Sequence, residues 1–236
     1  SYVERGELED GLMAYQETLR ALKEQHENGC PTQQRQDEIS QIIRALSDIY
    51  LRTHPSELQA PQLHRLALLY EDLGNWEKAL SLWEQVLFLQ SQTYGEESIE
   101  VADTLCQLAR VMISEGNHEG GLDLYHAAIA KHLTTSTPVP RDLISSVAQA
   151  YDQLEQQAEA ISWMKDLLEQ THTRDESASI HFELGKLCLE QGELLQASEA
   201  LCRCADFCDS DDEDVFKLLQ KVEFLQQHAD VAGVTR

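Results

Sequence analysis

Apolar and small residues recur at spacings of three and four along the chain, which places side chains on one face of a helix. One arrangement of these positions returns four times, each time across two helical segments separated by a turn. A small residue stands among large apolar ones in each first segment, at Ala67, Ala109, Ala148 and Gly185. Small side chains let two antiparallel helices approach closely, so the pattern predicts four packed helix pairs in an all-α chain.

The apolar spacing resembles the tetratricopeptide repeat pattern, W-x2-L-G-x2-Y followed by A-x3-F, with size-equivalent substitutes at most positions. In the first copy Leu66, Ala67 and Tyr70 match the first part of this pattern, and Ala79 with Trp83 matches the second. The resemblance implies an α-solenoid, which is a right-handed superhelix of antiparallel helix pairs. In such a solenoid the first helix of each pair lines a concave surface.

The copies advance by more than the roughly 34 residues usual for this family. Their tyrosine positions, held by Tyr70, Met112, Tyr151 and Cys188, give steps of 42, 39 and 37 residues. The first step resembles the kinesin light chain branch of the family, whose acidic, glycine-containing connection is similar to residues 93–102 here. We therefore expect helix pairs that are longer, or more widely connected, than those of the standard repeat.

The pattern divides a single predicted domain, residues 1–236, into repeats and additional helices. Because one helix pair alone leaves an apolar face in water, neighbouring pairs must stack, and the open end of the stack needs a cap. We expect a half repeat at 1–27, an inserted helix at 34–53 and a capping helix at 212–229. The four repeats are expected at 59–92, 97–133, 141–171 and 174–208.

The composition narrows the classes of partner. With 18 basic and 42 acidic residues the formal net charge is −24 at pH 7, which would repel nucleic acid and anionic membranes. No apolar run is long enough to predict membrane insertion, and the six scattered cysteines suit reduced thiols in the cytoplasm. Phosphate-binding loops and nucleophile elbows are absent from the sequence, so we expect a binding module, not an enzyme, and no cofactor.

Residues between the packing positions of each first helix predict a peptide-binding groove. Three of them, Arg65, Arg110 and Lys186, are basic in an acidic chain, which favours a partner segment of acidic character with an apolar anchor. Alternatively, these cations are ordinary surface charges that pair with neighbouring acids such as Glu183. The predicted groove residues are His64, Arg65, Leu68, Cys106, Gln107, Arg110, Ser145, Gln149, Phe182 and Lys186.

The sequence near the C-terminal end contains weak indications of a metal site and of a phosphorylation site. Cys202, Cys204 and Cys208 lie close together, but no CxxC pair occurs and Cys204 fills a packing position, which favours structural cysteines over a metal site. Ser210 stands in an acidic run and is either a phosphorylation site or an N-cap of the next helix.

The leading functional interpretation is an adaptor or scaffold that binds a peptide segment of a partner protein in its concave groove. An alternative is a regulatory or self-assembly domain of a larger multidomain protein, such as an enzyme. The half repeat expected at 1–27 is compatible with that alternative, because it suggests further repeats upstream.

Overall fold

The computed structural model describes residues 60–72, 74–171, 173–207 and 213–231, and all regular secondary structure in these ranges is α-helical. The half repeat expected at 1–27, the inserted helix expected at 34–53 and Ser210 lie outside the described residues. The chain divides into two compact units, of which the first ends at Leu89 and the second begins at Gln90. Each unit is described by itself.

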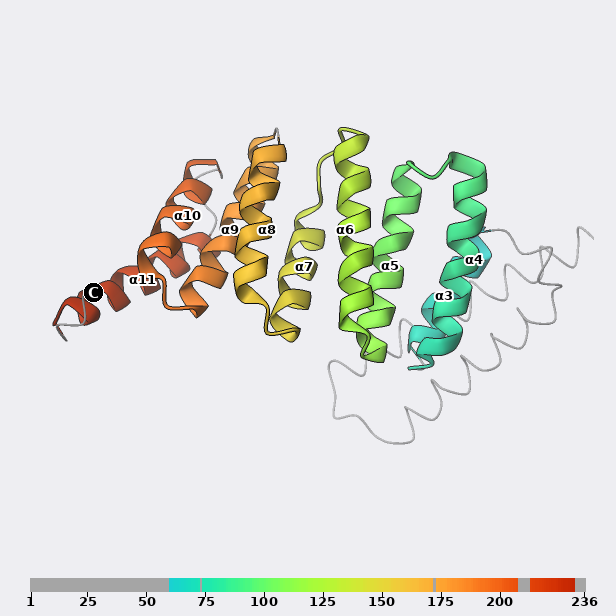
Figure 1. Ribbon diagram of the computed structural model, residues 1–236, viewed down its shortest axis with the longest axis horizontal. Coiled ribbons are helices and arrows are strands. Elements are labelled where there is room, and N and C mark those ends of the chain that lie inside the picture. Colours follow the sequence, from blue (N-terminus) through green and yellow to red (C-terminus); the bar gives the residue numbers. More distant parts are fainter. Residues whose placement is uncertain (1–59, 73, 172, 208–212, 232–236) are drawn as a thin grey trace, which may run out of the picture. The chain divides into compact units, whose positions relative to one another are not determined.

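The helices follow one another as pairs joined by short turns, so the predicted all-α repeat fold is confirmed. The first pair is α3 (Ala60–Asp72) and α4 (Trp76–Tyr94), and the boundary between the two units falls within α4. The second unit carries three further pairs and a last helix, which Figure 1 shows in chain order. These are α5 (Ile99–Glu115), α6 (His118–Thr134), α7 (Arg141–Gln153), α8 (Gln157–Gln170), α9 (Arg174–Glu190), α10 (Leu194–Phe207) and α11 (Glu213–Val231).

Local sequence signals set the helix ends. The Ser98 hydroxyl accepts a hydrogen bond from the Val101 amide at 3.4 Å and caps the start of α5. Gly116 ends the same helix with a φ of +100°, a left-handed conformation that disfavours residues with a Cβ. Helix α9 begins with a capping box, in which Thr173 and Glu176 satisfy each other's backbone amides.

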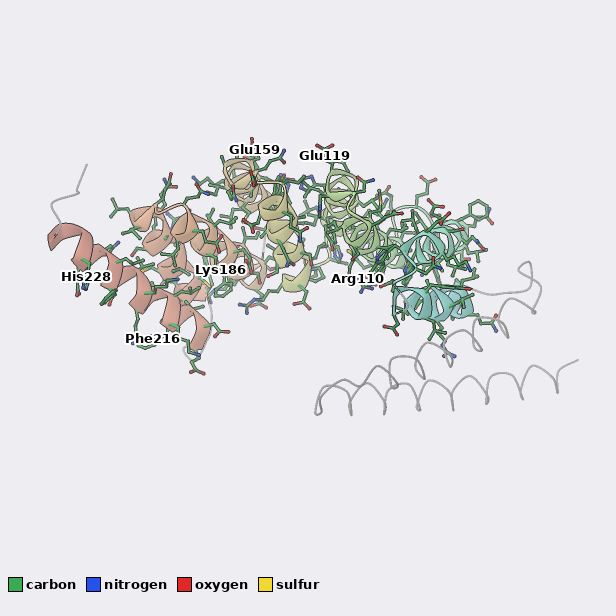
Figure 2. All side chains as sticks on the ribbon, turned by 90° about the horizontal axis from the view of Figure 1, so that it is seen from below. Arg110, Glu119, Glu159, Lys186, Phe216 and His228 are labelled. Carbon is green, nitrogen blue, oxygen red and sulfur yellow. The ribbon has the colours of Figure 1, made fainter. Side chains whose placement is uncertain are left out.

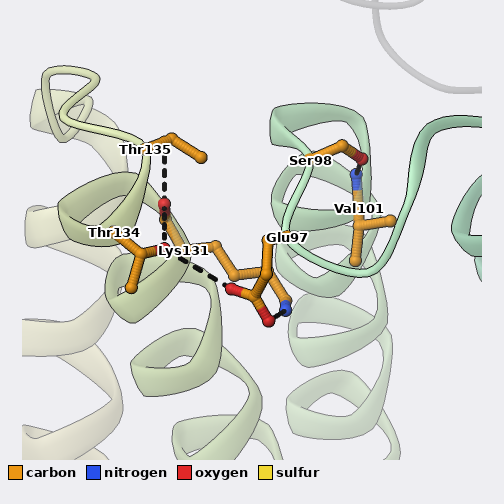
Figure 3. A network of polar contacts seen from close by, with 6 residues as sticks. All are labelled: Glu97, Ser98, Val101, Lys131, Thr134 and Thr135. Atoms are coloured by element: carbon orange, nitrogen blue, oxygen red, sulfur yellow. Dashed lines mark hydrogen bonds and ion pairs between the residues drawn. The ribbon is translucent and has the colours of Figure 1, made fainter.

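The connection before α5 is tied to the end of α6 by a small polar network (Figure 3). Lys131 donates to the Glu97 carboxylate at 3.3 Å, and the Thr134 hydroxyl donates to the same carboxylate at 3.4 Å. The Thr135 hydroxyl donates to the Lys131 carbonyl oxygen at 2.8 Å. Because Glu97 precedes α5 and Lys131 ends α6, these contacts join the two ends of one pair.

The small residues that predicted close packing are buried where the helices meet. Ala67 and Ala109 are 0% exposed, and Ala148 is 6% exposed. Gly185 of α9 faces α10, and a Cβ at this position would lie 2.6 Å from Cγ of Leu201. Since that distance is shorter than real Cβ contacts, only glycine allows α9 and α10 to pack at their present separation.

Helix α9 is the central element of the second unit, because it contacts α7, α8, α10 and α11. Helix α11 packs on α10 and α9 with Val215 and Val222, while its aromatic residues Phe216 and Phe224 remain exposed. We call the side formed by α5, α7 and α9 the first-helix face. Arg110 and Lys186 lie on this side, and Glu119 of α6 and Glu159 of α8 lie on the opposite side (Figure 2).

Candidate functional site

The three predicted groove residues of the first unit differ in exposure. Arg65 is exposed and Leu68 is 37% exposed, so both are available on α3. His64 is half-buried, because its ring meets Trp83 of α4 edge-to-face at 4.6 Å between centroids. Burial lowers the pKa of His64, and the neighbouring Arg65 cation lowers it further. His64 therefore serves the packing within the first pair.

Glu71 of α3 has a buried hydrogen-bond partner on α4. Trp83 donates its indole N–H to Oε1 of Glu71 at 2.6 Å, and both side chains are buried. This bond satisfies the indole nitrogen inside the pair, as a buried polar group requires. Glu71 is thus part of the interior of the first unit.

On α5, Arg110 is exposed and donates to the Gln107 side-chain oxygen at 2.6 Å, while Cys106 and Gln107 are half-buried. Burial raises the pKa of the Cys106 thiol to about 12, and the nearby Asp103 carboxylate adds to this shift. A thiol with such a pKa stays protonated at neutral pH, so Cys106 is unsuited to act as a nucleophile. This part of the first-helix face offers hydrogen-bonding groups around one exposed guanidinium.

Three predicted groove residues from two repeats line one common cavity. Ser145 and Gln149 of α7 and Lys186 of α9 border a volume of about 350 Å³, which we call the α7–α9 cavity. The remaining lining residues were not predicted as groove residues, although several follow the predicted ones at helical spacing. They are Ala148, Asp152, Glu183, Leu187 and Glu190.

Carboxylates dominate the charge of the α7–α9 cavity. Among the described residues that line it, Lys186 is the one cation, and its ammonium lies 2.7 Å from the buried carboxylate of Glu183. Glu183 also accepts a hydrogen bond from the Ser145 hydroxyl. For Lys186, the alternative of pairing with a neighbouring acid is therefore confirmed. Asp152 and Glu190 add two exposed carboxylates at the same cavity.

Phe182, expected in the groove, is buried at 9% exposure, so little of its ring is available to a partner. The Arg141 guanidinium lies 4.6 Å from the centre of its ring and the Lys186 ammonium lies 5.5 Å from it. The physical reason is that α9 has helices packed on several sides, which leaves less of its surface free than on a first helix at the edge of a stack. Phe182 belongs to the packing of α9.

Metal and redox chemistry find little support in the part of the chain that the structure describes. No group of three or more His, Cys, Asp or Glu side chains there is arranged to hold a metal ion. Cys204 is buried while Cys202 is exposed, so the two thiols point into different surroundings, and Cys208 lies outside the described residues. Among the described helices, none is long and apolar enough to cross a membrane.

Paired helices with small packing residues and short turns are typical of the tetratricopeptide repeat, and one sequence model of this family matches the chain. That model matches residues 59–131. This part of the chain therefore resembles the tetratricopeptide repeat family. Repeats of this kind are used as protein-interaction modules, because stacked pairs create extended binding surfaces.

Solved structures share this repeat fold. The putative kinesin light chain repeats of Podosopora anserina are 21% identical, with a TM-score of 0.57 over 83% of this chain and 94% of theirs. The C-terminal part of a tetratricopeptide repeat-containing protein from Cytophaga hutchinsonii is 13% identical, with a TM-score of 0.57 over 89% of this chain and 71% of that one. No curated protein matches the sequence significantly. The fold is thus similar to that of kinesin light chain-like repeats.

Proposed function

We propose that this chain is an adaptor that binds an extended segment of a partner protein on its first-helix face, with the α7–α9 cavity as the anchoring point. The observation that carries the proposal is that Ser145, Gln149 and Lys186, from two consecutive repeats, line one cavity. Its volume of about 350 Å³ lies within the range of ligand pockets, roughly 300 to 1,000 Å³. The proposal assigns binding, not catalysis, to the chain.

The charges of the cavity favour a basic partner segment. Asp152, Glu183 and Glu190 are negative, and the only lining cation, Lys186, is already held by Glu183. A lysine or arginine of the partner would gain attraction from the exposed carboxylates, whereas an aspartate or glutamate would be repelled. At this cavity the basic segment therefore replaces the acidic one that the groove cations suggested.

Hydrogen-bonding groups suit a peptide backbone or a polar side chain beside the basic one. Gln149 is exposed on α7 and presents an amide that both donates and accepts hydrogen bonds. Ala148 and Leu187 supply the apolar part of the lining. Such a mixture of an apolar wall and a few polar groups is usual for sites that fix the register of a bound segment.

The experiment selects peptides from a random displayed library on the full chain and measures their affinities by fluorescence anisotropy. We expect enrichment of lysine and arginine in the selected peptides. The Asp152→Lys/Glu190→Lys variant should weaken their binding about tenfold or more, which corresponds to about 1.4 kcal/mol. A matched control, Glu119→Lys/Glu159→Lys, makes the same charge change on the opposite side (Figure 2) and should leave affinity within about twofold.

Two results would count against the proposal. If the peptides whose binding the Asp152→Lys/Glu190→Lys variant changes are rich in aspartate and glutamate, the basic segment is wrong and the acidic interpretation returns. If both double variants weaken binding equally, the effect is one of overall charge, and the α7–α9 cavity is not the anchoring point.

A further inference from the structure

A second cavity lies on the other side of α9, where no groove residue was expected. It has a volume of about 390 Å³ and is bordered by α8, α9 and α10. We call it the α8–α10 cavity. Its lining residues are Lys165, Leu168, His181, Leu184, Cys188, Gln196, Glu199, Ala200 and Arg203.

The two cavities use opposite faces of the same helix. Helix α9 gives His181, Leu184 and Cys188 to the α8–α10 cavity, whereas Glu183 and Lys186 line the α7–α9 cavity. At 3.6 residues per turn these two sets point in roughly opposite directions from the helix axis. Binding at one cavity therefore leaves the lining of the other uncovered.

The α8–α10 cavity combines an apolar wall with two cations from two helices. Leu168, Leu184 and Ala200 form part of the apolar lining, and the exposed side chains of Lys165 and Arg203 stand on α8 and α10. Lys165 donates to the Gln196 side-chain oxygen at 3.3 Å. Because glutamine is uncharged, this bond does not neutralise the Lys165 ammonium. Arg203 donates to Glu199 at 2.8 Å.

The Arg203 pair is weak enough to yield to a ligand. Its two side chains are 58% and 66% exposed, and an ion pair so open to water contributes little to stability. Glu199 is also the only carboxylate among the lining residues, against two cations. In a chain with a formal charge of −24, this cavity is a local site of opposite sign.

His181 brings a buried ring nitrogen to the lining of the cavity. The residue is 7% exposed, and among the described residues its buried Nδ1 atom has no hydrogen-bond partner. Its ring stacks on Phe207 with centroids 6.0 Å apart and borders the cavity. Buried polar atoms in folded proteins nearly always have a partner, so a ligand group that reaches this nitrogen would complete the site.

We propose that the α8–α10 cavity is a second protein-binding site, which takes an acidic side chain next to an apolar one from a partner protein. The carboxylate lies between Lys165 and Arg203, and the apolar side chain contacts Leu168, Leu184 and Ala200. Charge complementarity selects this occupant, because the exposed cations would repel the basic segment assigned to the α7–α9 cavity. The proposal does not depend on that first site.

The test uses a labelled peptide of alternating glutamate and leucine and a second peptide with glutamine in place of glutamate. Anisotropy and two-dimensional NMR of the full chain are recorded for both. We expect the glutamate peptide to shift the signals of His181 and Ala200, and to bind about tenfold more tightly than the glutamine peptide. This comparison tests the charge without changing the protein.

Variants then locate the site. The Lys165→Glu/Arg203→Glu variant should weaken binding of the glutamate peptide about tenfold or more. Lys217→Glu/Lys221→Glu is the matched control, because it makes the same charge change on α11, where both lysines are exposed and neither is among the residues that line the cavity. The affinity of this control variant for the glutamate peptide should stay within about twofold of that of the unchanged protein. The Asp152→Lys/Glu190→Lys variant should also leave binding of this peptide unweakened.

The proposal is overturned if the glutamate peptide does not bind at millimolar concentration, or if the two peptides bind equally. Equal weakening by Lys217→Glu/Lys221→Glu and by the cavity variant also overturns it, since this result would indicate overall charge. The glutamate peptide tests the α8–α10 cavity alone. If the library yields no basic peptide for the α7–α9 cavity, the expected results for the glutamate peptide stay the same, so each proposal can fail without the other.

Discussion

The α7–α9 and α8–α10 cavities share one wall, helix α9, and differ in almost everything else. The first is lined by three carboxylates and one lysine that is already paired, and the second by two cations and one carboxylate. Among the described residues, the lining of the first contains no histidine, whereas the second contains a buried histidine with a nitrogen that has no hydrogen-bond partner. A single helix can therefore serve two partner segments of opposite charge.

Under the two proposals, individual neighbours and not net charge set the charge preference of each cavity. Both cavities belong to the same strongly acidic chain. Lys186 is neutralised because Glu183 stands one helical turn away, while Lys165 faces an uncharged glutamine. Since exposed charges act mainly within about 8 Å at physiological salt, such local pairs decide what each cavity attracts.

The largest expected effect comes from the shared wall itself. Gly185→Val should lower the free energy of unfolding by about 3 kcal/mol, because any Cβ here meets the fully buried Leu201. Urea unfolding followed by circular dichroism measures the change. Ser179→Ala, on the same helix, is the control and should shift stability by less than about 0.5 kcal/mol. If Gly185→Val lowers the free energy of unfolding as little as Ser179→Ala does, close packing of α9 on α10 at Gly185 is not required for stability.

Much of the fold follows from the sequence because its signals are local. The small residues at Ala67 and Ala109 predicted helix packing, and the turn glycine Gly116 has the left-handed conformation that ends a helix. Helical spacing from Ser145 and Lys186 also located two sides of one cavity before the structure placed them together. Periodicity identifies which face of a helix is free, even without knowledge of its neighbours.

The rest depended on contacts that no single helix encodes. Phe182 was expected to be accessible, but several helices pack around α9 and bury it. The α8–α10 cavity joins residues from three helices, so its cations Lys165 and Arg203 could not be associated by spacing along one of them. A histidine such as His181 looks like any surface histidine in the sequence, and only its burial distinguishes it.

The next largest effect should come from one substitution made in each cavity. Glu183→Gln removes a carboxylate of the α7–α9 cavity and releases Lys186, so basic peptides should bind there about tenfold more weakly, or about 1.4 kcal/mol. Glu199→Gln removes the carboxylate of the α8–α10 cavity and should strengthen binding of the glutamate–leucine peptide about threefold, or about 0.7 kcal/mol. Anisotropy titrations measure both. Changes of the same sign for both peptides would abolish the distinction between the cavities.

A smaller effect is expected from pH. Burial lowers the pKa of His181, the Arg203 cation lowers it further, and Glu199 opposes the shift, while Lys165 adds positive charge from α8. In the free protein the lowered pKa means that stability is lost as pH falls below 6.5. A carboxylate bound beside His181 raises the pKa of this histidine. Binding of the peptide therefore takes up a proton and strengthens as the pH falls.

We therefore expect the glutamate–leucine peptide to bind a few-fold more tightly at about pH 5.5 than at about pH 7. His181→Gln should remove this dependence, and binding of basic peptides at the α7–α9 cavity should stay constant over the same range. Calorimetric titration at the two pH values measures all three. A pH dependence that survives in His181→Gln would assign it to another group.

The smallest effect is expected where a charge pair lies outside both cavities. Glu97, 69% exposed, pairs with Lys131 between the start of α5 and the end of α6 (Figure 3). Glu97→Gln should change the free energy of unfolding by less than about 1 kcal/mol, because the Glu97 carboxylate is solvated before and after folding. The difference should shrink further in high salt, and neither peptide should bind differently. Urea unfolding at low and high salt supplies the measurement. If Glu97→Gln changes peptide affinity as much as Glu183→Gln does, the carboxylates act through the field of the whole chain, and the opposite preferences of the two cavities lose their local cause.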